Sequence, residues 1–142
     1  EGGPWGDLMS VAAKARECAG LVIDGYVRDG AVIREHDFDV FARGLSVKGT
    51  SKENLGLVNH PVSCGGVIVE PGDLILGDDD GVCVVPKADA AYVLERATIR
   101  LQEEQRSRAR FAQGETLWST AGFQETAVAK GLREEPVSGA NQ

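Results

Sequence analysis

The sequence lacks the features that mark membrane proteins and nucleic-acid-binding proteins. No apolar run approaches the ~20 residues that a membrane-spanning helix requires. Positive charge is in deficit, because 15 Lys and Arg stand against 22 Asp and Glu and give a formal net charge of −7. Such a chain has little field to attract nucleic acid or an anionic membrane surface, so we expect neither partner. No signal peptide is visible, and we expect a cytoplasmic protein.

Cysteine and histidine are also scarce. Cys18, Cys64 and Cys83 are odd in number and fall in helix or strand patterns. This favours three buried, reduced thiols over a disulfide framework. His36 and His60 have no Cys, His or carboxylate nearby at metal-ligand spacing, so we expect both to be ordinary loop residues.

The apolar residues that are present suffice for one globular domain. The 142 residues are 42% hydrophobic and include 18 Gly, which indicates a turn-rich fold with a core. We expect this domain to occupy residues 1–116. Residues 117–142 are expected to form an extension, with a weak helix at 121–130 and a disordered tail at 134–142.

The N-terminal stretch predicts a helix followed by a buried strand. Residues 8–19 are rich in helix formers and carry apolar residues at helical spacing, with Asp7 suited to the N-cap and Gly20 ending the helix. The run at 21–23 is typical of a buried strand. Arg28 and Asp29 follow it, at the place where open α/β folds bind their ligands.

The start of this helix is suited to an anion. Gly6 would let the backbone approach a ligand closely, and the free N–H groups of Leu8 and Met9 would point outward from the helix N-terminus. With an arginine and a carboxylate nearby, the pattern suggests a metal-assisted site for a small oxo acid. Asp29 would hold a hard divalent cation, and Arg28 would fix carboxylate or enolate charge.

Short elements and one long helix follow. Helical turns are expected at 30–35 and strands at 40–43, 56–59, 62–69, 74–76 and 82–85. A turn or bulge is expected at 65–66, turns at 71–72 and 77–81, and a helix at 88–113 that Gly114 ends. Short strands at close spacing predict a layered mixed sheet. The second half of the long helix is too polar to bury in its own domain, so we expect it to lie along the surface or across a neighbour.

Several motifs stand in order along residues 3–116. They are Gly6-Asp7-Leu8-Met9, Arg28-Asp29 at its spacing from Asp7, Phe41-Ala42-Arg43-Gly44, Val58-Asn59 with Pro61-Val62, Gly65-Gly66-Val67, Pro71-Gly72-Asp73, and Asp78-Asp79-Asp80-Gly81-Val82 with Val84-Val85-Pro86. This set resembles the RraA-like class II pyruvate aldolases. Their type members are the 4-hydroxy-4-methyl-2-oxoglutarate / 4-carboxy-4-hydroxy-2-oxoadipate aldolases of aromatic-acid catabolism.

The resemblance implies a fold and a reaction. The expected fold is an α/β, RraA-like swivelling β/β/α layered domain with a mixed sheet and a long C-terminal helix. The reaction is a retro-aldol cleavage, a carbon–carbon lyase activity that yields pyruvate plus pyruvate or oxaloacetate, with oxaloacetate decarboxylation as a side activity. Members of the family carry an N-terminal portion ahead of this point, so we expect the chain to be a fragment, a processed form or an incomplete protein.

The resemblance also assigns roles to residues. Asp7 and Arg28 would be catalytic, with Asp7 orienting a metal-bound water, and Asp29 would hold Mg²⁺ or Mn²⁺. The substrate would be bound by Gly6, Leu8, Met9 and Arg28. The family assembles as homotrimers or homohexamers, in which an acid from an adjacent subunit reaches the site. Glu103 and Glu104 on the long helix are the candidates for this acid.

Alternatives remain for several of these residues. Without the surrounding motifs, the Arg28 and Asp29 pair would be an ordinary surface salt bridge. Trp5 could line the pocket or pack in the core. The carboxylates at 78–80 suggest a turn rather than a metal site. Schiff-base chemistry would need a desolvated lysine, and none of the candidates looks desolvated: Lys14, Lys48 and Lys52.

A second function class is open as well. The same fold includes regulators that inhibit ribonuclease E by binding it, so a protein-binding module is the competing hypothesis. These regulators lack the carboxylate after the arginine and the long charged helix. Asp29 and residues 88–113 therefore favour the enzyme, although a catalytically inactive scaffold is a third option.

Overall fold

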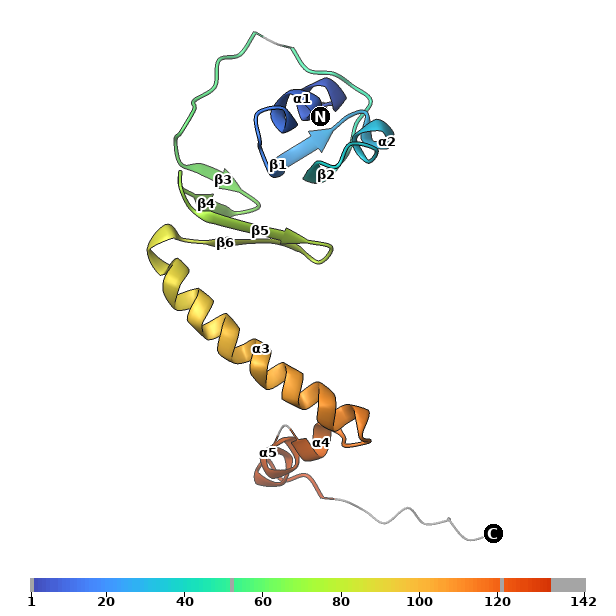
Figure 1. Ribbon diagram of the computed structural model, residues 1–142, viewed down its shortest axis with the longest axis vertical. Coiled ribbons are helices and arrows are strands. Elements are labelled where there is room, and N and C mark those ends of the chain that lie inside the picture. The colour runs from blue at the N-terminus through green and yellow to red at the C-terminus, as the bar shows by residue number, and fades with distance from the viewer. Residues whose placement is uncertain (1, 52, 121, 134–142) are drawn as a thin grey trace, which may run out of the picture. The chain divides into compact units, whose positions relative to one another are not determined.

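The computed structural model describes residues 2–51, 53–120 and 122–133, which form two compact units, Glu1–Ala90 and Ala91–Gln142. Figure 1 shows the elements of both units. The first unit contains the short strands and two small helices, and the second contains the long helix. The predicted domain boundary at residue 116 stays a prediction.

The first unit begins with helix α1 (Asp7–Lys14), which is shorter than the predicted helix at 8–19. The helix ends early because Glu17 adopts a left-handed conformation with φ of 61°, and the Cys18 N–H turns back to the Ala13 carbonyl at 3.2 Å. Strand β1 (Gly20–Val27) then starts at the glycine that was expected only to end the helix.

Strand β1 pairs in parallel with β2 (Asp39–Leu45), and helix α2 (Gly30–Ile33) lies in the connection between them. The register shifts between Ile23 and Tyr26, and Trp5 forms an isolated parallel bridge with Val27. The helical turn expected at 30–35 is confirmed. Because β1 continues to Val27, Arg28 and Asp29 lie directly at the carboxyl end of a parallel strand.

Two antiparallel hairpins follow. The first joins β3 (Val62–Cys64) to β4 (Val67–Val69) through Gly65 and Gly66, whose φ values of 59° and 84° suit glycine. The second joins β5 (Leu74–Asp78) to β6 (Gly81–Val85). The turns and hairpins predicted here are confirmed.

The strand expected at 56–59 is wrong, because the described residues of this stretch form no strand. Asn59 has a φ of 56° and precedes Pro61, and the Leu57 side chain is 79% exposed. An apolar run without a partner strand cannot satisfy its backbone groups as a sheet. The described strands form three two-stranded sheets, one parallel and two antiparallel, where one mixed sheet was expected.

The described residues bury few side chains, and most of these lie near the end of β1. The buried apolar residues are Val27, Ile33, Phe38 and Val85, and Ser10 is fully buried. The three cysteines are free, but the expectation that they are buried is wrong. Cys18 and Cys83 are exposed and Cys64 is half-buried, because Cys18 follows the end of α1 and strand β6 is shielded only at Val84 and Val85.

A 3₁₀ turn (η1, Lys87–Asp89) leads to helix α3 (Ala90–Ala112), which confirms the long helix predicted at 88–113. Gly114, with a φ of 92°, follows it as predicted. Two short helices, α4 (Leu117–Thr120) and α5 (Phe123–Ala129), occupy part of the expected extension, and the tail at 134–142 lies outside the described residues. Within the part of the chain that is described, no helix is both long and apolar enough to span a membrane.

Candidate active site

Arg28 and Asp29 form the centre of the candidate site. Asp29 adopts a left-handed conformation (φ 60°, ψ 30°), and its carbonyl accepts the Ile33 N–H at 3.0 Å. Aspartate tolerates this conformation better than most residues. The chain therefore turns sharply at Asp29 from strand β1 into α2, and the two charged side chains stay next to each other, with Arg28 Nε 3.5 Å from Asp29 Oδ2.

The N-terminus of α1 meets this turn. Gly6 precedes the helix in an extended conformation, and Asp7 is its first residue, so the prediction of Asp7 as the N-cap is wrong. The Asp7 N–H donates to Asp29 Oδ2 at 3.3 Å. Gly6 is the N-cap because its carbonyl accepts the N–H groups of Met9 and Ser10. The Asp7 N–H has no partner inside the helix, and its bond to Asp29 joins the two motifs.

The amide groups of Leu8 and Met9 differ in their availability. The Met9 N–H donates to the Gly6 carbonyl at 3.2 Å, so the expectation that it is free for a ligand is wrong. The first turn is tight enough for this i−3 bond, which satisfies one of the donors that a helix start leaves open. Among the described residues the Leu8 N–H has no acceptor, and it is the donor left for an anion.

Gly6 lies in close contact with both charged side chains. A Cβ at this position would stand 2.5 Å from Asp29 Oδ2 and 2.9 Å from Arg28 Nε. Its φ of −152° is available to any residue, so the glycine is required here by space rather than by backbone conformation. The groups that approach Gly6 belong to the chain itself, and the prediction that it lets a ligand approach closely stays a prediction.

Arg28 is anchored before any ligand arrives. One Nη1 hydrogen is donated to the Gly3 carbonyl at 2.8 Å, and Nη1 lies 3.4 Å from the Pro4 carbonyl. The Arg28 backbone N–H donates to the Trp5 carbonyl at 2.8 Å. Among the described residues Nη2 has no partner, so the guanidinium is held in place while one of its nitrogens remains open.

The two oxygens of Asp29 are likewise unequal. Oδ2 accepts the Asp7 N–H and lies beside the Arg28 guanidinium, whereas no described group bonds to Oδ1. The side chain is 40% exposed, and Oδ1 is the oxygen that no described residue occupies. A carboxylate fixed through one oxygen and free at the other is suited to ligating a hard cation.

The sequence interpretation missed Ser10, a buried residue of α1 that is hydrogen-bonded to Trp5 and Gly6 beside the site. Its hydroxyl accepts the Trp5 indole N–H at 2.8 Å and lies 3.4 Å from the Gly6 carbonyl, to which it donates. Trp5 stacks on Phe38, with ring centroids 6.3 Å apart. Of the two expectations for Trp5, packing against the core is therefore the one the structure supports. Nothing in the sequence distinguished this serine from a solvent-facing one.

A second charged cluster involves Asp24, in the middle of β1. Its carboxylate forms an ion pair with Arg43 and accepts the Gly65 N–H at 3.0 Å. The Arg43 guanidinium, and secondly this N–H, hold the pKa of Asp24 below its ordinary value. The pair connects β1 to β2 and to the β3–β4 turn, so it has an evident structural role.

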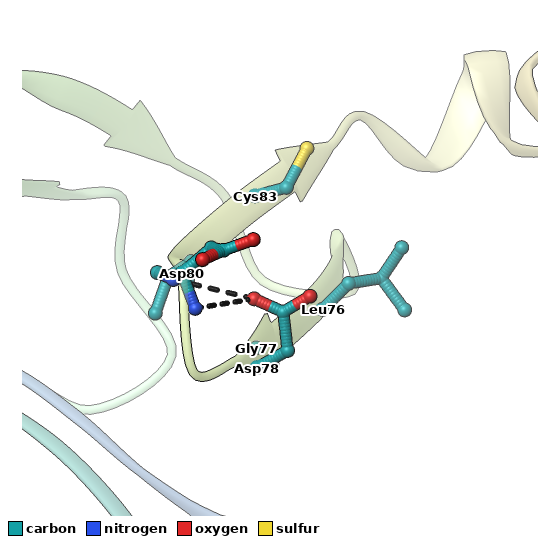
Figure 2. A pocket seen from close by; sticks show the side chains of 7 residues that line it. Leu76, Gly77, Asp78, Asp80 and Cys83 are labelled. Carbon is teal, nitrogen blue, oxygen red and sulfur yellow. Dashed lines mark hydrogen bonds between the residues drawn. The ribbon is translucent and has the colours of Figure 1, made fainter.

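The carboxylates at 78–80 form the turn that was predicted. Asp78 Oδ1 accepts the N–H groups of Asp80 and Gly81 at 2.9 and 3.3 Å, and Figure 2 shows this side chain directed back into the hairpin tip. A hollow of about 460 Å³ lies at this tip. A larger, mainly apolar hollow of about 1030 Å³ is lined by strands β1 to β6. Neither hollow is lined by Arg28 or Asp29.

The two candidate acids from the long helix differ in their pairing. Glu104 accepts Arg100 Nε at 2.8 Å and lies 3.9 Å from Arg108, and the Arg100 hydrogen bond lowers the pKa of Glu104. Among the described residues the Glu103 side chain forms no ion pair. Both acids belong to the second unit, whereas the other candidate residues belong to the first.

Comparisons with known proteins agree on the family. The model of the RraA-like family, described as Aldolase/RraA, matches residues 1–84. A Halalkalibacterium halodurans protein, provisionally named a 4-hydroxy-4-methyl-2-oxoglutarate aldolase, is 42% identical over 105 residues, which are 73% of this chain and 50% of that protein. The chain spans about half the length of the curated relatives it matches.

Solved structures show the same fold. A crystal structure of an uncharacterised protein from Pseudomonas syringae pv. tomato matches with a TM-score of 0.78 and 34% identity, covering 84% of this chain and 60% of that one. RraAS2 of Streptomyces coelicolor, titled an unusual member of the RNase ES inhibitor RraA protein family, matches with a TM-score of 0.71 and 35% identity, covering 77% and 56%. The fold is thus shared by proteins with different titles.

Proposed function

Because the chain belongs to the RraA-like family, we propose that it is a metal-dependent pyruvate aldolase with its active site at Arg28 and Asp29. The substrate would be 4-hydroxy-4-methyl-2-oxoglutarate, as the name of the H. halodurans relative suggests, or 4-carboxy-4-hydroxy-2-oxoadipate, which the motif resemblance implies. One observation carries the proposal: the turn at Arg28 and Asp29 brings together an anchored guanidinium, the Asp29 Oδ1 atom and, next to Asp7, the Leu8 N–H, and the last two have no hydrogen-bond partner among the described residues.

The donor set fits a lightly held Mg²⁺ or Mn²⁺ ion. Among the described residues no three His, Cys, Asp or Glu side chains are grouped as a metal cage. A single open carboxylate is nevertheless what magnesium commonly uses, because this ion keeps several waters and takes further oxygens from the substrate. Asp29 Oδ1 would be the direct protein ligand. When bound, the ion would act as a Lewis acid that polarises the 2-oxo group.

The chain's own residues would bind the substrate and meet its developing charge. The 2-oxo carboxylate would accept the Leu8 N–H at the start of α1, where the helix dipole also favours an anion. The open side of the Arg28 guanidinium would stabilise the enolate charge as the C3–C4 bond breaks. Asp7, the first residue of α1, would orient a water that takes the C4 hydroxyl proton as C4 becomes a carbonyl and then gives a proton to C3 of the enolate. The same enolate chemistry would decarboxylate oxaloacetate.

Lysine chemistry is the less favourable mechanism. Lys14 forms an exposed ion pair with Asp37 at 3.3 Å, and its side chain is 48% exposed, so it is not desolvated. A Schiff-base lysine needs a lowered pKa, which burial or a neighbouring cation provides. Lys52, also considered, lies outside the described residues. A divalent ion is therefore the electrophile we propose.

We propose further that the site is completed by an acid from a neighbouring subunit of a homotrimer or homohexamer. Glu103 is the better candidate of the two, because among the described residues its carboxylate forms no ion pair with an arginine of its own helix. Exposed helical ion pairs are weak, so the pairing of Glu104 disfavours it only slightly. We expect the assembly to act in the cytoplasm, in aromatic-acid catabolism.

The decisive experiment is pyruvate release from both 4-hydroxy-2-oxo diacids and from oxaloacetate, with and without EDTA. We expect EDTA to abolish the release and Mg²⁺ or Mn²⁺ to restore it. Full activity in chelator, with borohydride trapping the substrate on a lysine, would contradict the metal mechanism.

A protein-binding function is the second candidate, because the RraAS2 structure, whose title names an RNase inhibitor family, matches this chain. It would require a complex with ribonuclease E that survives Asp29→Asn, because that substitution changes the charge of the site and not its shape. Such a complex, together with no pyruvate from any of the three substrates, would favour the regulator.

A further inference from the structure

The buried residue of helix α1 is a serine, whereas three of its apolar residues are exposed. Ser10 has no exposed surface, whereas Leu8 is 78% exposed, Val11 48% and Met9 45%. Burying a hydroxyl is costly unless it is hydrogen-bonded, and serine forms helices less readily than alanine. The hydrogen bonds of Ser10 are therefore the reason for a serine at this position.

Those bonds join two parts of the structure. On one side, the Ser10 hydroxyl accepts the indole N–H of Trp5 at 2.8 Å. Trp5 is itself held by its stack on the buried ring of Phe38, by a bridge to Val27 and by its carbonyl, which accepts the Arg28 N–H. The indole is thus a fixed donor, and the serine is oriented by it.

On the other side, Ser10 holds the carbonyl of Gly6. This oxygen accepts the N–H groups of Met9 and Ser10, both at 3.2 Å, and the Ser10 hydroxyl at 3.4 Å. Three donors fix the orientation of the peptide between Gly6 and Asp7. The N–H of that same peptide is the group that donates to Asp29 Oδ2.

We propose that Ser10 is a positioning residue of the candidate site: its hydroxyl transmits the fixed position of Trp5 to the Gly6–Asp7 peptide, which holds Asp29 with Oδ1 open. The inference rests on the proposed function, because it assigns Ser10 an effect on metal binding at Asp29. It goes beyond that function in naming a residue that contacts neither metal nor substrate.

The test removes the same hydrogen bond from either end. Ser10→Ala removes the acceptor, and Trp5→Phe removes the indole N–H while keeping a ring to stack on Phe38. The double variant completes a cycle. Thr98→Ala is the matched control, because the Thr98 hydroxyl donates to the Leu94 carbonyl at 2.8 Å with the same i−4 geometry on the exposed surface of α3.

The readout is Mn²⁺ affinity of the full chain, measured by electron paramagnetic resonance of the free ion, beside kcat for pyruvate release. We expect Ser10→Ala to weaken Mn²⁺ binding and lower kcat by about 10-fold each, as for groups that orient a metal ligand. Trp5→Phe should change both in the same direction and have no further effect in the Ser10→Ala background. Thr98→Ala should match the wild type.

Two results would overturn the inference. One is wild-type Mn²⁺ affinity and kcat in folded Ser10→Ala or Trp5→Phe protein, and the other is fully additive effects of the two substitutions. If Ser10→Ala does not fold, Trp5→Phe decides alone. Failure of the proposed function would give a different result. In that case the wild type would either not bind Mn²⁺ or bind it as well as Asp29→Ala does.

Discussion

Gly6→Ala is the substitution that best separates the geometry of the site from the stability of the fold. The added Cβ would stand 2.5 Å from Asp29 Oδ2, and ordinary contact begins at 3.4 Å, so these atoms must move apart by 3.4 − 2.5 = 0.9 Å. The backbone at Gly6 is extended and accommodates alanine without strain. The displacement therefore falls on Asp29 and Arg28, whose side chains are 40% and 33% exposed and can move.

A shift of this size should cost much in catalysis and little in stability. Misplacing a reacting group by about 1 Å lowers rates by about 10²-fold, and we expect kcat to fall by this factor, with weaker Mn²⁺ binding. The partly exposed ion pair contributes at most about 1 kcal/mol to folding, so the free energy of unfolding should change by no more than that. Urea unfolding and steady-state kinetics measure the two quantities.

Gly25→Ala is the matched control for this experiment. It lies in the same strand that ends at the site, its φ is not positive, and a Cβ there would meet only Ile23 at 3.7 Å, an ordinary contact. Its kcat should equal that of the wild type. A Gly6→Ala protein with wild-type kcat and Mn²⁺ affinity would refute the reasoning, because it would show that the contact with Asp29 does not set the site.

Three further predictions concern the charged pair itself, the assembly of the protein and the Asp24–Arg43 pair. Asp29→Ala should abolish turnover, with poor rescue by excess Mg²⁺, and wild-type turnover in this variant would place the site elsewhere. Arg28→Lys should lower kcat and kcat/KM alike with metal affinity nearly intact, since lysine lacks the planar fork of the guanidinium. Light scattering of the full-length protein should give at least a trimer, and an active monomer would remove Glu103 and Glu104 from the site. Because Arg43 lowers the pKa of Asp24, the ionised pair should stabilise the fold above the unfolded pKa of about 3.9 and lose this effect as pH falls through the folded pKa. Arg43→Gln should raise the Asp24 pKa measured by NMR and reduce this acid dependence, and an unchanged Asp24 pKa would contradict the assignment.

The sequence was sufficient where backbone conformation follows from single residues. Gly65 and Gly66 predicted a turn or bulge, and the structure has a hairpin turn there. Gly114 predicted the end of the long helix, and the Asp-Gly step predicted the β5–β6 turn, because glycine is favoured where φ is positive. The motif spacing also identified the chain segment that ends at Arg28 and Asp29. These features depend on local chemistry, which the sequence states directly.

The sequence was insufficient where a hydrogen bond between distant residues decides the outcome. Asp7 was expected at the N-cap, but the N-cap is Gly6, and the N–H of Asp7 donates to Asp29, 22 residues later. The helical spacing of apolar residues in 8–19 predicts a buried apolar face, yet Leu8 and Val11 are exposed and Ser10 is buried. Periodicity ranks residues by hydrophobicity, and it could not find a buried serine whose partners are an indole and a carbonyl.

The Arg28 and Asp29 pair contributes little to the stability of the fold, although it constrains the backbone and the residues around it. Asp29 occupies a left-handed conformation that disfavours most side chains, and a Cβ at Gly6 would displace the Asp29 and Arg28 side chains. The ion pair is exposed enough to contribute little to stability. A chain selected only for stability would prefer glycine or asparagine at 29 and alanine at 6. Constraints that do not stabilise a fold tend to gather at functional sites, where the geometry itself is what is needed. These constraints without a gain in stability are the physical reason to search for the activity at this turn, although the two hollows of the same unit lie elsewhere.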